Sequence, residues 1–480
     1  MLRSTKIVAT LGPASSDPAV LERMIRSGVD VVRLNFSHGT AEDHLARAAL
    51  VKEIGAKTGR TVAIMCDLQG PKIRVGKFKN GMINLQKGQS FVLDAGCELG
   101  DGDRAGLDYK ELPRDVGTGS VLLLDDGKIV LDVTGVRGEE VHTKVRHGGV
   151  LSNNKGINRQ GGGLTAPALT PKDIEDIRTA AKIKADYLAV SFPKTGADMY
   201  MARELLRASG GKAFLIAKIE RAEAVTPAAL LDIMNACDGI MVARGDLAVE
   251  VGDAAVPALQ KRMIRLAREH NKLTITATQM MESMIESPVP TRAEVSDVAN
   301  AVLDGTDAVM LSAESASGKY PVEAIEAMHR ICVQAEQTQP VSLDQDFLNR
   351  VFTRVDQSIA MAGLFTAFHL KVKAIATLTE SGSTALWMSR LNCGVPIYAL
   401  TAQTATRYRC ALFRDVYPLM VKYVGSDREE LLGEAERVLV ENGVVKDDDL
   451  IVLTIGEPIG KSGGTNTMKI VKVGEQRNRL

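Results

Sequence analysis

Short apolar runs alternate with amphipathic segments along the first two thirds of the chain. Eight runs of β-branched and aliphatic residues are typical of strands and occupy residues 5–12, 29–39, 61–70, 186–193, 214–220, 239–247, 273–280 and 307–315. Segments with helical spacing of apolar residues follow most of them, at 21–28, 44–59, 173–184, 256–270 and 292–305. Apolar strands that alternate with helices predict a parallel sheet, and eight such units predict a (β/α)8 TIM barrel.

Two of the predicted helices carry start signals. Thr170 followed by Pro171 combines an N-cap residue with proline at the first helical position. Thr291 and Glu294 have the spacing of a capping box. These signals support the helical interpretation of the segments that follow them.

Two regions depart from this alternation. Between residues 71 and 166, period-two patterns and the turn signals at 80–81 and 125–128 predict β-hairpins, so we expect an inserted β lid domain. After about residue 345, four further strand patterns with helices between them predict a C-terminal α/β domain. The predicted domains are therefore a barrel at 1–70 and 167–344, the insert at 71–166 and the C-terminal domain at 345–480.

Composition narrows the class of protein. Lys plus Arg equals Asp plus Glu at 59 each in 480 residues, which disfavours nucleic-acid and membrane-surface partners. The chain has no long apolar run, and the N-terminal segment lacks the pattern of a signal peptide. Six scattered cysteines without a C-x-x-C motif suit a reduced, cytoplasmic protein.

Polar side chains gather where the predicted barrel strands end. Six of the eight ends carry charged or hydroxyl groups: Arg33, Asn35, Ser37 and His38; Asp67; Lys218 and Glu220; Arg244 and Asp246; Thr278; Ser312 and Glu314. Any one of them could be a loop cap or a surface ion pair. Catalytic groups of such barrels lie at the C-terminal ends of the strands, however, so the convergence predicts an active site there.

Lys218 and Glu220 lie two positions apart in an otherwise apolar run, so both would project from the same face of a strand. Glu220 and Asp246 suit a hard divalent cation such as Mg2+. With the cations of Lys218 and Arg33 they would form a clamp for a phosphoryl group. The alternatives are a structural ion pair, which is costly to bury, and a Schiff-base lysine of an aldolase.

Several motifs resemble those of the pyruvate kinase family, in the family's order. They are KIVATLGPAS (6–15), VVRLNFSHG (31–39), GPKIRVG (70–76), NNKGIN (153–158), FLIAKIERAEAV (214–225), IMVARGDLAVE (240–250), TATQMMESM (276–284) and DAVMLSAESASGKYP (307–321). The resemblance implies a bacterial-type phosphotransferase that converts phosphoenolpyruvate and ADP to pyruvate and ATP in glycolysis. It also implies a barrel with a small β-barrel lid inserted after the third strand and a C-terminal regulatory domain.

The resemblance assigns roles to the matching residues. Arg33 would bind the substrate phosphate, Lys218 would stabilise the phosphoryl group during transfer, and Glu220 and Asp246 would hold Mg2+ or Mn2+. The backbone amides of Gly245 and Asp246 would meet the substrate carboxylate, and Thr278 would contact the substrate. The nucleotide-binding residues would be Arg74, Lys155 and His38.

The C-terminal domain contains a candidate effector site. The segment 377–384 runs from a predicted strand into a predicted helix. The hydroxyls and free backbone amides at this helix N-terminus could bind an anion, or a serine hydroxyl could simply cap the helix, and the spacing favours neither interpretation. The family binds phosphorylated effectors there, so the resemblance favours a sugar-phosphate or nucleotide effector. The candidate residues are Thr379, Ser381, Gly382, Ser383 and Thr384, with the loop 456–467 closing over the ligand. Coupling to the barrel would pass through a homotetramer.

The segment after the third strand departs from the commoner family pattern. Many members need K+ and read Asp-Thr-Lys-Gly-Pro-Glu-Ile-Arg-Thr there, whereas residues 67–75 read Asp-Leu-Gln-Gly-Pro-Lys-Ile-Arg-Val. The resemblance places the monovalent-cation pocket at Asn35, Ser37, Asp67 and the carbonyl of Leu68. The ammonium of Lys72 replaces a carboxylate and would serve in place of K+. We predict an enzyme that does not require K+; the alternative is a solvated lysine at the lid hinge.

Two other functions fit parts of the pattern. A metal-dependent barrel aldolase or mutase acting on pyruvate enolate would share the metal chemistry, but it would not need a nucleotide-covering lid or Lys155. A non-enzymatic sugar-phosphate sensor would use the C-terminal domain alone, and the complete charged set on the barrel disfavours it. Dependence on ADP separates the first alternative from a kinase, and measurable turnover eliminates the second.

Overall fold

The centre of the molecule is a closed barrel of eight parallel strands. The computed structural model describes residues 2–338, 351–422, 427–459 and 463–475. The barrel strands are β1 Lys6–Thr10, β2 Val31–Asn35, β3 Ala63–Asp67, β14 Tyr187–Val190, β15 Phe214–Ile219, β16 Gly239–Ala243, β17 Leu273–Ala277 and β18 Ala308–Leu311. Each strand pairs with its neighbours in the order of the chain, and β1 closes the ring against β18. The predicted barrel and its eight strands are confirmed.

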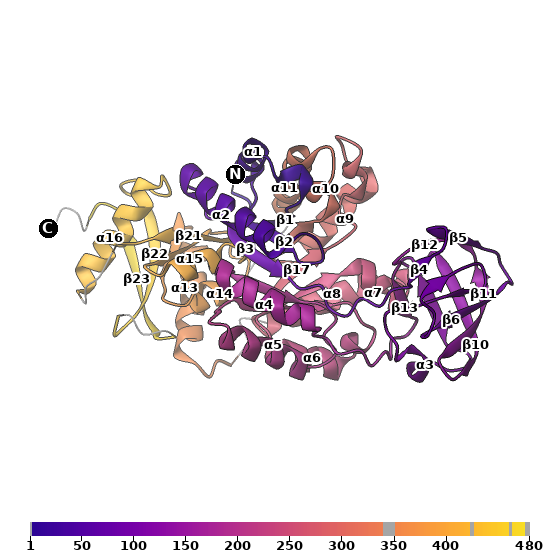
Figure 1. The fold of residues 1–480 in the computed structure, drawn as a ribbon. Helices are drawn as coiled ribbons and strands as arrows, with labels where there is room; N and C mark the ends of the chain where they lie inside the picture. Colours follow the sequence, from indigo (N-terminus) through magenta and orange to yellow (C-terminus); the bar gives the residue numbers. More distant parts are fainter. Residues whose placement is uncertain (1, 339–350, 423–426, 460–462, 476–480) are drawn as a thin grey trace.

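Helices surround this barrel (Figure 1). The long ones are α1 Pro18–Ser27, α2 Ala41–Thr58, α4 Pro171–Ile183, α5 Gly196–Ala208, α6 Pro227–Ala236, α8 Val256–Glu269, α9 Arg292–Leu303 and α11 Pro321–Thr338, and two short ones are α7 Arg244–Val251 and α10 Ala313–Ala316. Both predicted start signals are confirmed, because Thr170 and Thr291 form capping boxes. The apolar spacing did not predict α5, α6 or α11, and α6 in particular has few polar residues to mark a solvent face.

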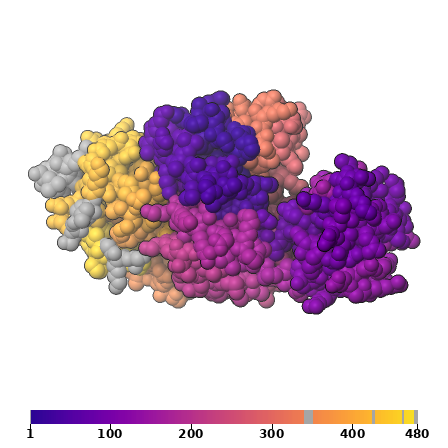
Figure 2. Space-filling view, in the orientation of Figure 1, coloured from indigo at the N-terminus to yellow at the C-terminus, as the bar shows by residue number. Residues whose placement is uncertain are grey.

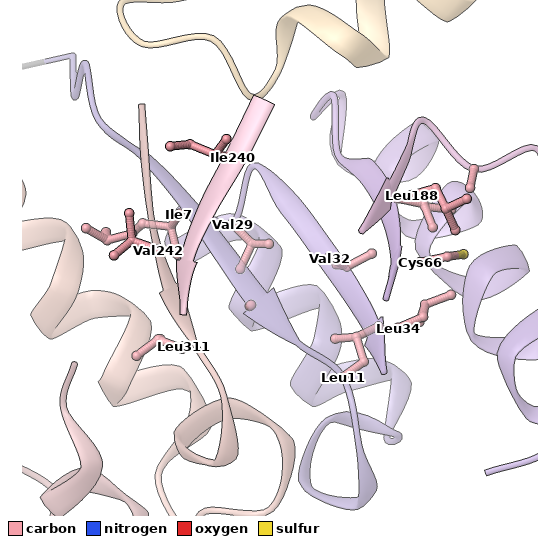
Figure 3. Close-up of a cluster of buried hydrophobic side chains, with 14 of the residues drawn as sticks. Ile7, Leu11, Val29, Val32, Leu34, Cys66, Leu188, Ile240, Val242 and Leu311 are labelled. Carbon is pink, nitrogen blue, oxygen red and sulfur yellow. The ribbon is translucent and has the colours of Figure 1, made fainter. Parts of the chain in front are cut away.

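Alternate side chains of the barrel strands serve two cores. Ile7, Val32, Leu34 and Val242 point outward and pack beneath the helices (Figure 3). Met65 and other inward-facing residues fill the barrel and are continuous with apolar residues of the C-terminal region. The barrel is therefore a packed scaffold, and its strand ends are held rigidly where polar groups project from them.

The segment between β3 and α4 forms a separate β unit, which we call the insert (purple in Figure 1). Its elements are β4 Lys77–Phe78, β5 Met82–Leu85, β6 Ser90–Asp94, β7 Leu99–Gly100, β8 Arg104–Ala105, α3 Leu112–Asp115, β9 Val121–Leu124, β10 Ile129–Arg137, β11 Glu140–His147, β12 Gly149–Ser152 and β13 Ile157–Arg159. Six strands form a sheet in the order β13-β9-β10-β11-β6-β8, and two short pairs complete the unit around a core of its own.

One predicted hairpin of the insert is present and one is not. Residues 125–128 connect β9 to β10, which pair antiparallel as expected. The turn at 80–81 does not join a hairpin, because β4 pairs with β7 and β5 pairs with β12. A short polar turn signal therefore located the turn but not the partners of the strands beside it.

The C-terminal region is an α/β unit whose apolar core continues into the barrel interior (Figure 1, orange to yellow). Its elements are α13 Val355–Leu370, β19 Ala374–Leu378, α14 Ser383–Met388, β20 Ile397–Thr401, α15 Thr404–Cys410, β21 Val416–Met420, α16 Arg428–Glu441, β22 Leu450–Gly456 and β23 Thr465–Lys472. Four parallel strands form the sheet, and β23, which the sequence did not predict, adds an antiparallel edge.

The three units follow one another along the molecule, with the barrel between the other two (Figure 2). The insert projects from one side of the barrel, and a notch separates part of it from the barrel helices in this view. None of the helices in the described ranges has the length and apolarity needed to cross a membrane.

Candidate active site

Lys218 and Glu220 come together at the C-terminal end of β15. Lys218 lies in the strand and Glu220 directly follows it. The Lys218 Nζ atom is 2.9 Å from Glu220 Oε1, and the two side chains are only 12% and 1% exposed. Glu220 Oε2 accepts a hydrogen bond from the Phe192 N–H at 2.9 Å. An ammonium and a carboxylate thus share one nearly dry position at the mouth of the barrel.

Two further charges, from β2 and β3, meet this pair across the mouth of the barrel. Arg33 at β2 donates from Nε to Asp67 Oδ2 at 2.5 Å and from Nη1 to Thr10 Oγ1 at 3.1 Å. The other oxygen of Asp67 is 3.5 Å from Lys218 Nζ and accepts no hydrogen bond from the described residues. Arg33, Asp67, Lys218 and Glu220 therefore form one buried cluster, with acceptor capacity left over.

The cluster shifts the acidity of its members. Burial lowers the pKa of Lys218, but the carboxylates of Asp67 and Glu220 outweigh that effect, so the pKa lies above its ordinary value. Burial raises the pKa of Glu220 to about 7, against the opposing pull of Lys218, and Asp246 and Asp67 raise it further. Two carboxylates beside one ammonium hold the charge of Lys218, whereas at Glu220 the effect of burial is greater than the compensation from that ammonium.

Ser191 is a member of the cluster that sequence reasoning missed. Its hydroxyl follows the last residue of β14, accepts a hydrogen bond from Lys218 Nζ at 2.8 Å and donates to the Leu68 carbonyl at 2.7 Å. The available signal was a hydroxyl near the C-terminal end of the predicted strand 186–193. Ser191 fixes the direction in which Lys218 extends.

The sequence pattern had placed Asp246 on a strand, but the residue lies in the first turn of α7. β16 ends at Ala243 and α7 begins at Arg244, so no loop separates them. The Gly245 N–H donates to Thr278 Oγ1 at 2.9 Å, which brings the predicted substrate contacts Gly245, Asp246 and Thr278 together. A carboxylate that binds the Gly245 amide must therefore share or displace the Thr278 hydroxyl.

Arg244 holds the turn that carries Thr278. Thr278 and Gln279 both adopt the left-handed backbone conformation, with φ of 66° and 53°. Such residues cost of order 1 kcal/mol each unless the surroundings hold them. The Arg244 guanidinium donates to the carbonyls of both residues at 2.7 and 3.1 Å and pairs with Asp297 at 2.7 Å. Its role is thus to position the turn, although its strand-end position had suggested a direct one.

Lys72 reaches the site from the start of the insert. Its Nζ atom lies 3.7 Å from Asp246 Oδ1, and the side chains are 32% and 25% exposed. Glu220 and Asp246 are therefore each paired with a lysine, Lys218 on one side and Lys72 on the other. Among the predicted monovalent-cation ligands, Asn35 Oδ1 accepts the Ser37 N–H at 3.1 Å, and the Leu68 carbonyl accepts the Ser191 hydroxyl.

The predicted nucleotide-binding residues do not contact the charged cluster. Arg74 donates from Nη1 to the Asn154 carbonyl at 3.0 Å, and Lys155 Nζ is 2.8 Å from Asp125 Oδ1. Both pairs lie within the insert, where Lys155 lowers the pKa of Asp125. His38 is exposed beyond the end of β2. The structure thus leaves these residues at the rim, on two different units.

Comparison with known proteins places this site in a family. Residues 2–325 match the description "Pyruvate kinase, barrel domain", and residues 357–471 match "Pyruvate kinase, alpha/beta domain". The chain belongs to the pyruvate kinase family. "Pyruvate kinase II" of Salmonella typhimurium (strain LT2) is 52% identical over 476 residues, which cover 98% of this chain and 99% of that relative.

Other pyruvate kinases are similar over nearly the whole chain. The Haemophilus influenzae relative is 51% identical over 461 residues, covering 95% of this chain and 96% of its own length. The Geobacillus stearothermophilus relative is 42% identical over 477 residues, covering 98% of this chain and 80% of its own length. The chain is therefore a phosphotransferase with the bacterial type of pyruvate kinase sequence.

The donor set of this pyruvate kinase family member suits a divalent cation that shares its coordination with substrate. The described residues contain no group of three or more His, Cys, Asp or Glu side chains arranged to hold a metal alone. Glu220 and Asp246 provide two carboxylates that interact electrostatically. Mg2+ is usually bound by one or two carboxylates plus substrate oxygens and water, so the two side chains fit that ion.

The predicted effector segment borders a cavity of about 360 Å3 in the C-terminal unit. Thr379, Ser383 and Thr384 line this cavity, whereas Ser381 and Gly382 are not among its lining residues. Thr384 Oγ1 is hydrogen-bonded to Thr465 Oγ1 at 2.7 Å. The predicted closing loop contributes residues 456, 459 and 463–465, and its residues 460–462 lie outside the described part of the chain.

Proposed function

We propose that this protein transfers the phosphoryl group of phosphoenolpyruvate to ADP, giving pyruvate and ATP in the last step of glycolysis. The observation that carries the proposal is the buried cluster of Arg33, Asp67, Lys218 and Glu220 at the mouth of the barrel. A charged cluster with unused acceptor capacity is poorly explained by stability, because burying charges is costly. It suits a reaction in which negative charge must be met while it moves.

Each barrel residue has a specific task in this proposal. The Arg33 guanidinium binds the substrate phosphate, and its hydrogen bond to Asp67 fixes its direction. The Lys218 ammonium, held by Glu220 and Ser191, lies beside the phosphoryl group as it leaves the enolate oxygen and joins the β-phosphate of ADP. The amides of Gly245 and Asp246 receive the substrate carboxylate, and Thr278 contacts the substrate beside them.

Glu220 and Asp246 are the proposed ligands of Mg2+ or Mn2+. The ion, when bound, supplies positive charge for the enolate oxygen and the carboxylate of the substrate. The lysines that pair with these two carboxylates keep the site compensated before substrate and metal arrive. When the metal binds, Glu220 and Asp246 exchange these lysines for the ion. Lysine side chains suit this exchange because they are flexible.

The rim residues complete the site from the insert, which is proposed to act as a lid. Arg74 and Lys155 would bind the nucleotide, together with His38, when the insert moves toward the barrel. Lys155 is paired with the Asp125 carboxylate, which supports the idea that its ammonium exchanges this carboxylate for a nucleotide phosphate when the insert closes. Lys72 is proposed to occupy the place of K+ beside the pocket of Asn35, Ser37, Asp67 and Leu68, so that the enzyme runs without K+.

The C-terminal unit is proposed to bind a sugar-phosphate or nucleotide effector in its cavity, within a cytoplasmic homotetramer. Support comes from the hydroxyls of Thr379, Ser383 and Thr384 on the cavity wall. Initial rates measured with a panel of sugar phosphates and AMP test the proposed effector binding. Rates that do not change across the panel at low phosphoenolpyruvate would remove it without affecting the proposed reaction.

The reaction itself is tested by an initial-rate assay with purified full-length protein. Pyruvate should form only when phosphoenolpyruvate, ADP and Mg2+ or Mn2+ are all present. Pyruvate formation that does not depend on ADP would indicate an aldolase or mutase type of chemistry instead. Absence of turnover under all combinations would leave only a binding function.

A further inference from the structure

Glu250 links three parts of the molecule and has no role in the reaction proposed above. It lies in α7, one turn after Asp246, so the two side chains project from the same side of the helix. Only 5% of Glu250 is exposed. Burying a carboxyl group is unfavourable unless hydrogen bonds compensate for it, and its hydrogen bonds therefore indicate its purpose.

The first link joins the two proposed metal ligands. Glu250 Oε2 accepts a hydrogen bond from the Ala222 N–H at 2.8 Å. Ala222 lies two residues after Glu220, whereas Glu250 shares its helix with Asp246. The Glu250 side chain thus connects the backbone that carries one proposed ligand to the helix that carries the other.

The second link reaches the insert where it returns to the barrel. The Gly161 N–H donates to the Glu250 carbonyl at 3.0 Å, and the Asn158 side chain hydrogen-bonds to the Glu250 carboxyl. Gly163 donates to Glu223 beside this contact. The returning strand of the insert is therefore attached to α7 through Glu250 and to the loop after β15 through Glu223.

The chain between these attachments turns through three consecutive glycines. Gly161, Gly162 and Gly163 have φ of 81°, 77° and 91°, which glycine adopts without strain and other residues do not. A Cβ atom at Gly162 would lie 2.3 Å from Glu223 Oε2. These three glycines form the turn by which the insert returns to the barrel, and the hydrogen bonds to Glu250 hold its end.

We propose that Glu250 is a positioning residue that sets the separation of Glu220 and Asp246 and ties it to the placement of the insert. This proposal rests on the proposed function, since it assumes that these two carboxylates bind the divalent cation. Metal-site partners of this kind commonly affect metal affinity by tenfold or more when removed. Burial also raises the pKa of Glu250 to about 7, so glutamine closely resembles its protonated form.

The test measures Mn2+ binding to the full-length protein without substrates, by electron paramagnetic resonance of free MnCl2. Glu250→Ala should raise the dissociation constant roughly tenfold, because the Ala222 N–H loses its acceptor. Glu250→Gln should stay within about threefold, since its amide oxygen can still accept that hydrogen bond. At saturating Mn2+, kcat of Glu250→Ala should stay within about threefold of the wild type, because the residue touches no reacting group.

Hydrogen exchange and a matched variant provide the control. Glu250→Ala should speed amide exchange at Ala222 but not at Gly161, whose N–H is held by the backbone carbonyl of residue 250. Glu223→Ala should speed exchange at Gly163 and leave the Mn2+ dissociation constant within about twofold. Equal weakening by Glu223→Ala would overturn the proposal, since any loosening of the insert would then suffice. Unchanged Mn2+ binding in folded Glu250→Ala would also overturn it.

Two further variants keep the outcomes separate. Asp246→Asn should weaken Mn2+ binding more than any Glu250 variant; if it does not, the proposed metal site is wrong, whatever Glu250 does. If Glu250→Ala fails to fold, Glu250→Asp replaces it, because a side chain shorter by one methylene no longer reaches Ala222. Wild-type Mn2+ affinity in Glu250→Asp would contradict the positioning role.

Discussion

The carboxylates at the two ends of the barrel have opposite surroundings. At the N-terminal end, Asp30, Asp186, Asp238 and Asp307 each precede an alternate strand, and each accepts the N–H of the second residue of the neighbouring strand at 2.8 to 2.9 Å. At the C-terminal end, Asp67 keeps an oxygen without a hydrogen bond and Glu220 shares one lysine with it. The carboxylates at the N-terminal end are all held by backbone N–H groups, whereas at the C-terminal end Glu220 accepts only that of Phe192 and keeps its other oxygen for Lys218.

Asp307 shows how far this commitment goes. Arg390 of the C-terminal unit meets both of its oxygens, and the two side chains are 1% and 0% exposed. The Arg414 N–H and the Thr274 N–H and hydroxyl use its remaining acceptor positions. A carboxylate with all its acceptor positions used stabilises the native state, whereas one with partners that can leave is available for chemistry. Removing charge from the two ends should therefore have different consequences.

The largest effect on activity is expected from Lys218→Met. Its ammonium is proposed to meet charge mainly in the transition state, so kcat should fall on the order of a thousandfold, about 4 kcal/mol, with a much smaller change in KM. The melting temperature should change by less than about 3 °C, because Glu220, with a raised pKa near 7, can take up a proton instead of remaining an unpaired charge.

Two readouts sharpen this prediction. Enolisation of pyruvate, followed by exchange of its methyl protons with deuterium, transfers no phosphoryl group and should survive Lys218→Met better than the full reaction. Near-normal turnover in Lys218→Met would contradict the role assigned to the residue. A large loss of thermal stability would contradict the contrast between the two ends.

Asp307→Ala should show the reverse pattern. It leaves the buried Arg390 guanidinium without its carboxylate, which costs about 3 kcal/mol or more and should lower the melting temperature by roughly 5 to 10 °C. Asp238→Ala is the matched control, because the Asp238–Arg203 pair is 26% and 22% exposed and is worth about 1 kcal/mol. Equal melting temperatures for the two variants, measured by calorimetry, would show that the buried Asp307–Arg390 pair does not stabilise the fold.

The same comparison shows what the sequence could and could not predict. The strands, the capping boxes and the adjacency of Lys218 and Glu220 follow from spacings of two to four residues, so they were predictable locally. The pairing of Arg390 with Asp307 spans 83 residues and depends on how two units dock, and the contact of Lys72 with Asp246 depends on where the insert returns. Ser191 was within reach, since a hydroxyl near the end of a predicted strand was the pattern used elsewhere.

The smallest predicted effect concerns the lysine at the edge of the cluster at the C-terminal end of the barrel. Lys72 Nζ lies 3.7 Å from Asp246, where many family members have a glutamate and require K+. An ammonium there supplies one positive charge and opposes entry of another cation. We therefore expect initial rates of the wild type in tetramethylammonium buffer to be unchanged when KCl is added at constant ionic strength.

Lys72→Glu should reverse this behaviour. The variant brings a second carboxylate close to Asp246, and like charges at that distance require a cation between them. Its rate without K+ should fall about tenfold, which corresponds to a rise of about 1.4 kcal/mol in the activation barrier. The rate should recover with KCl, because K+ then replaces the positive charge of the missing ammonium. Lys77→Glu makes the same change of charge at an exposed position of the insert and should show no K+ effect. Strong activation of the wild type by KCl would contradict this role and indicate that Lys72 is a solvated lysine at the hinge of the insert. The carboxylates at the C-terminal end of the barrel would then need an external monovalent cation to balance their charge.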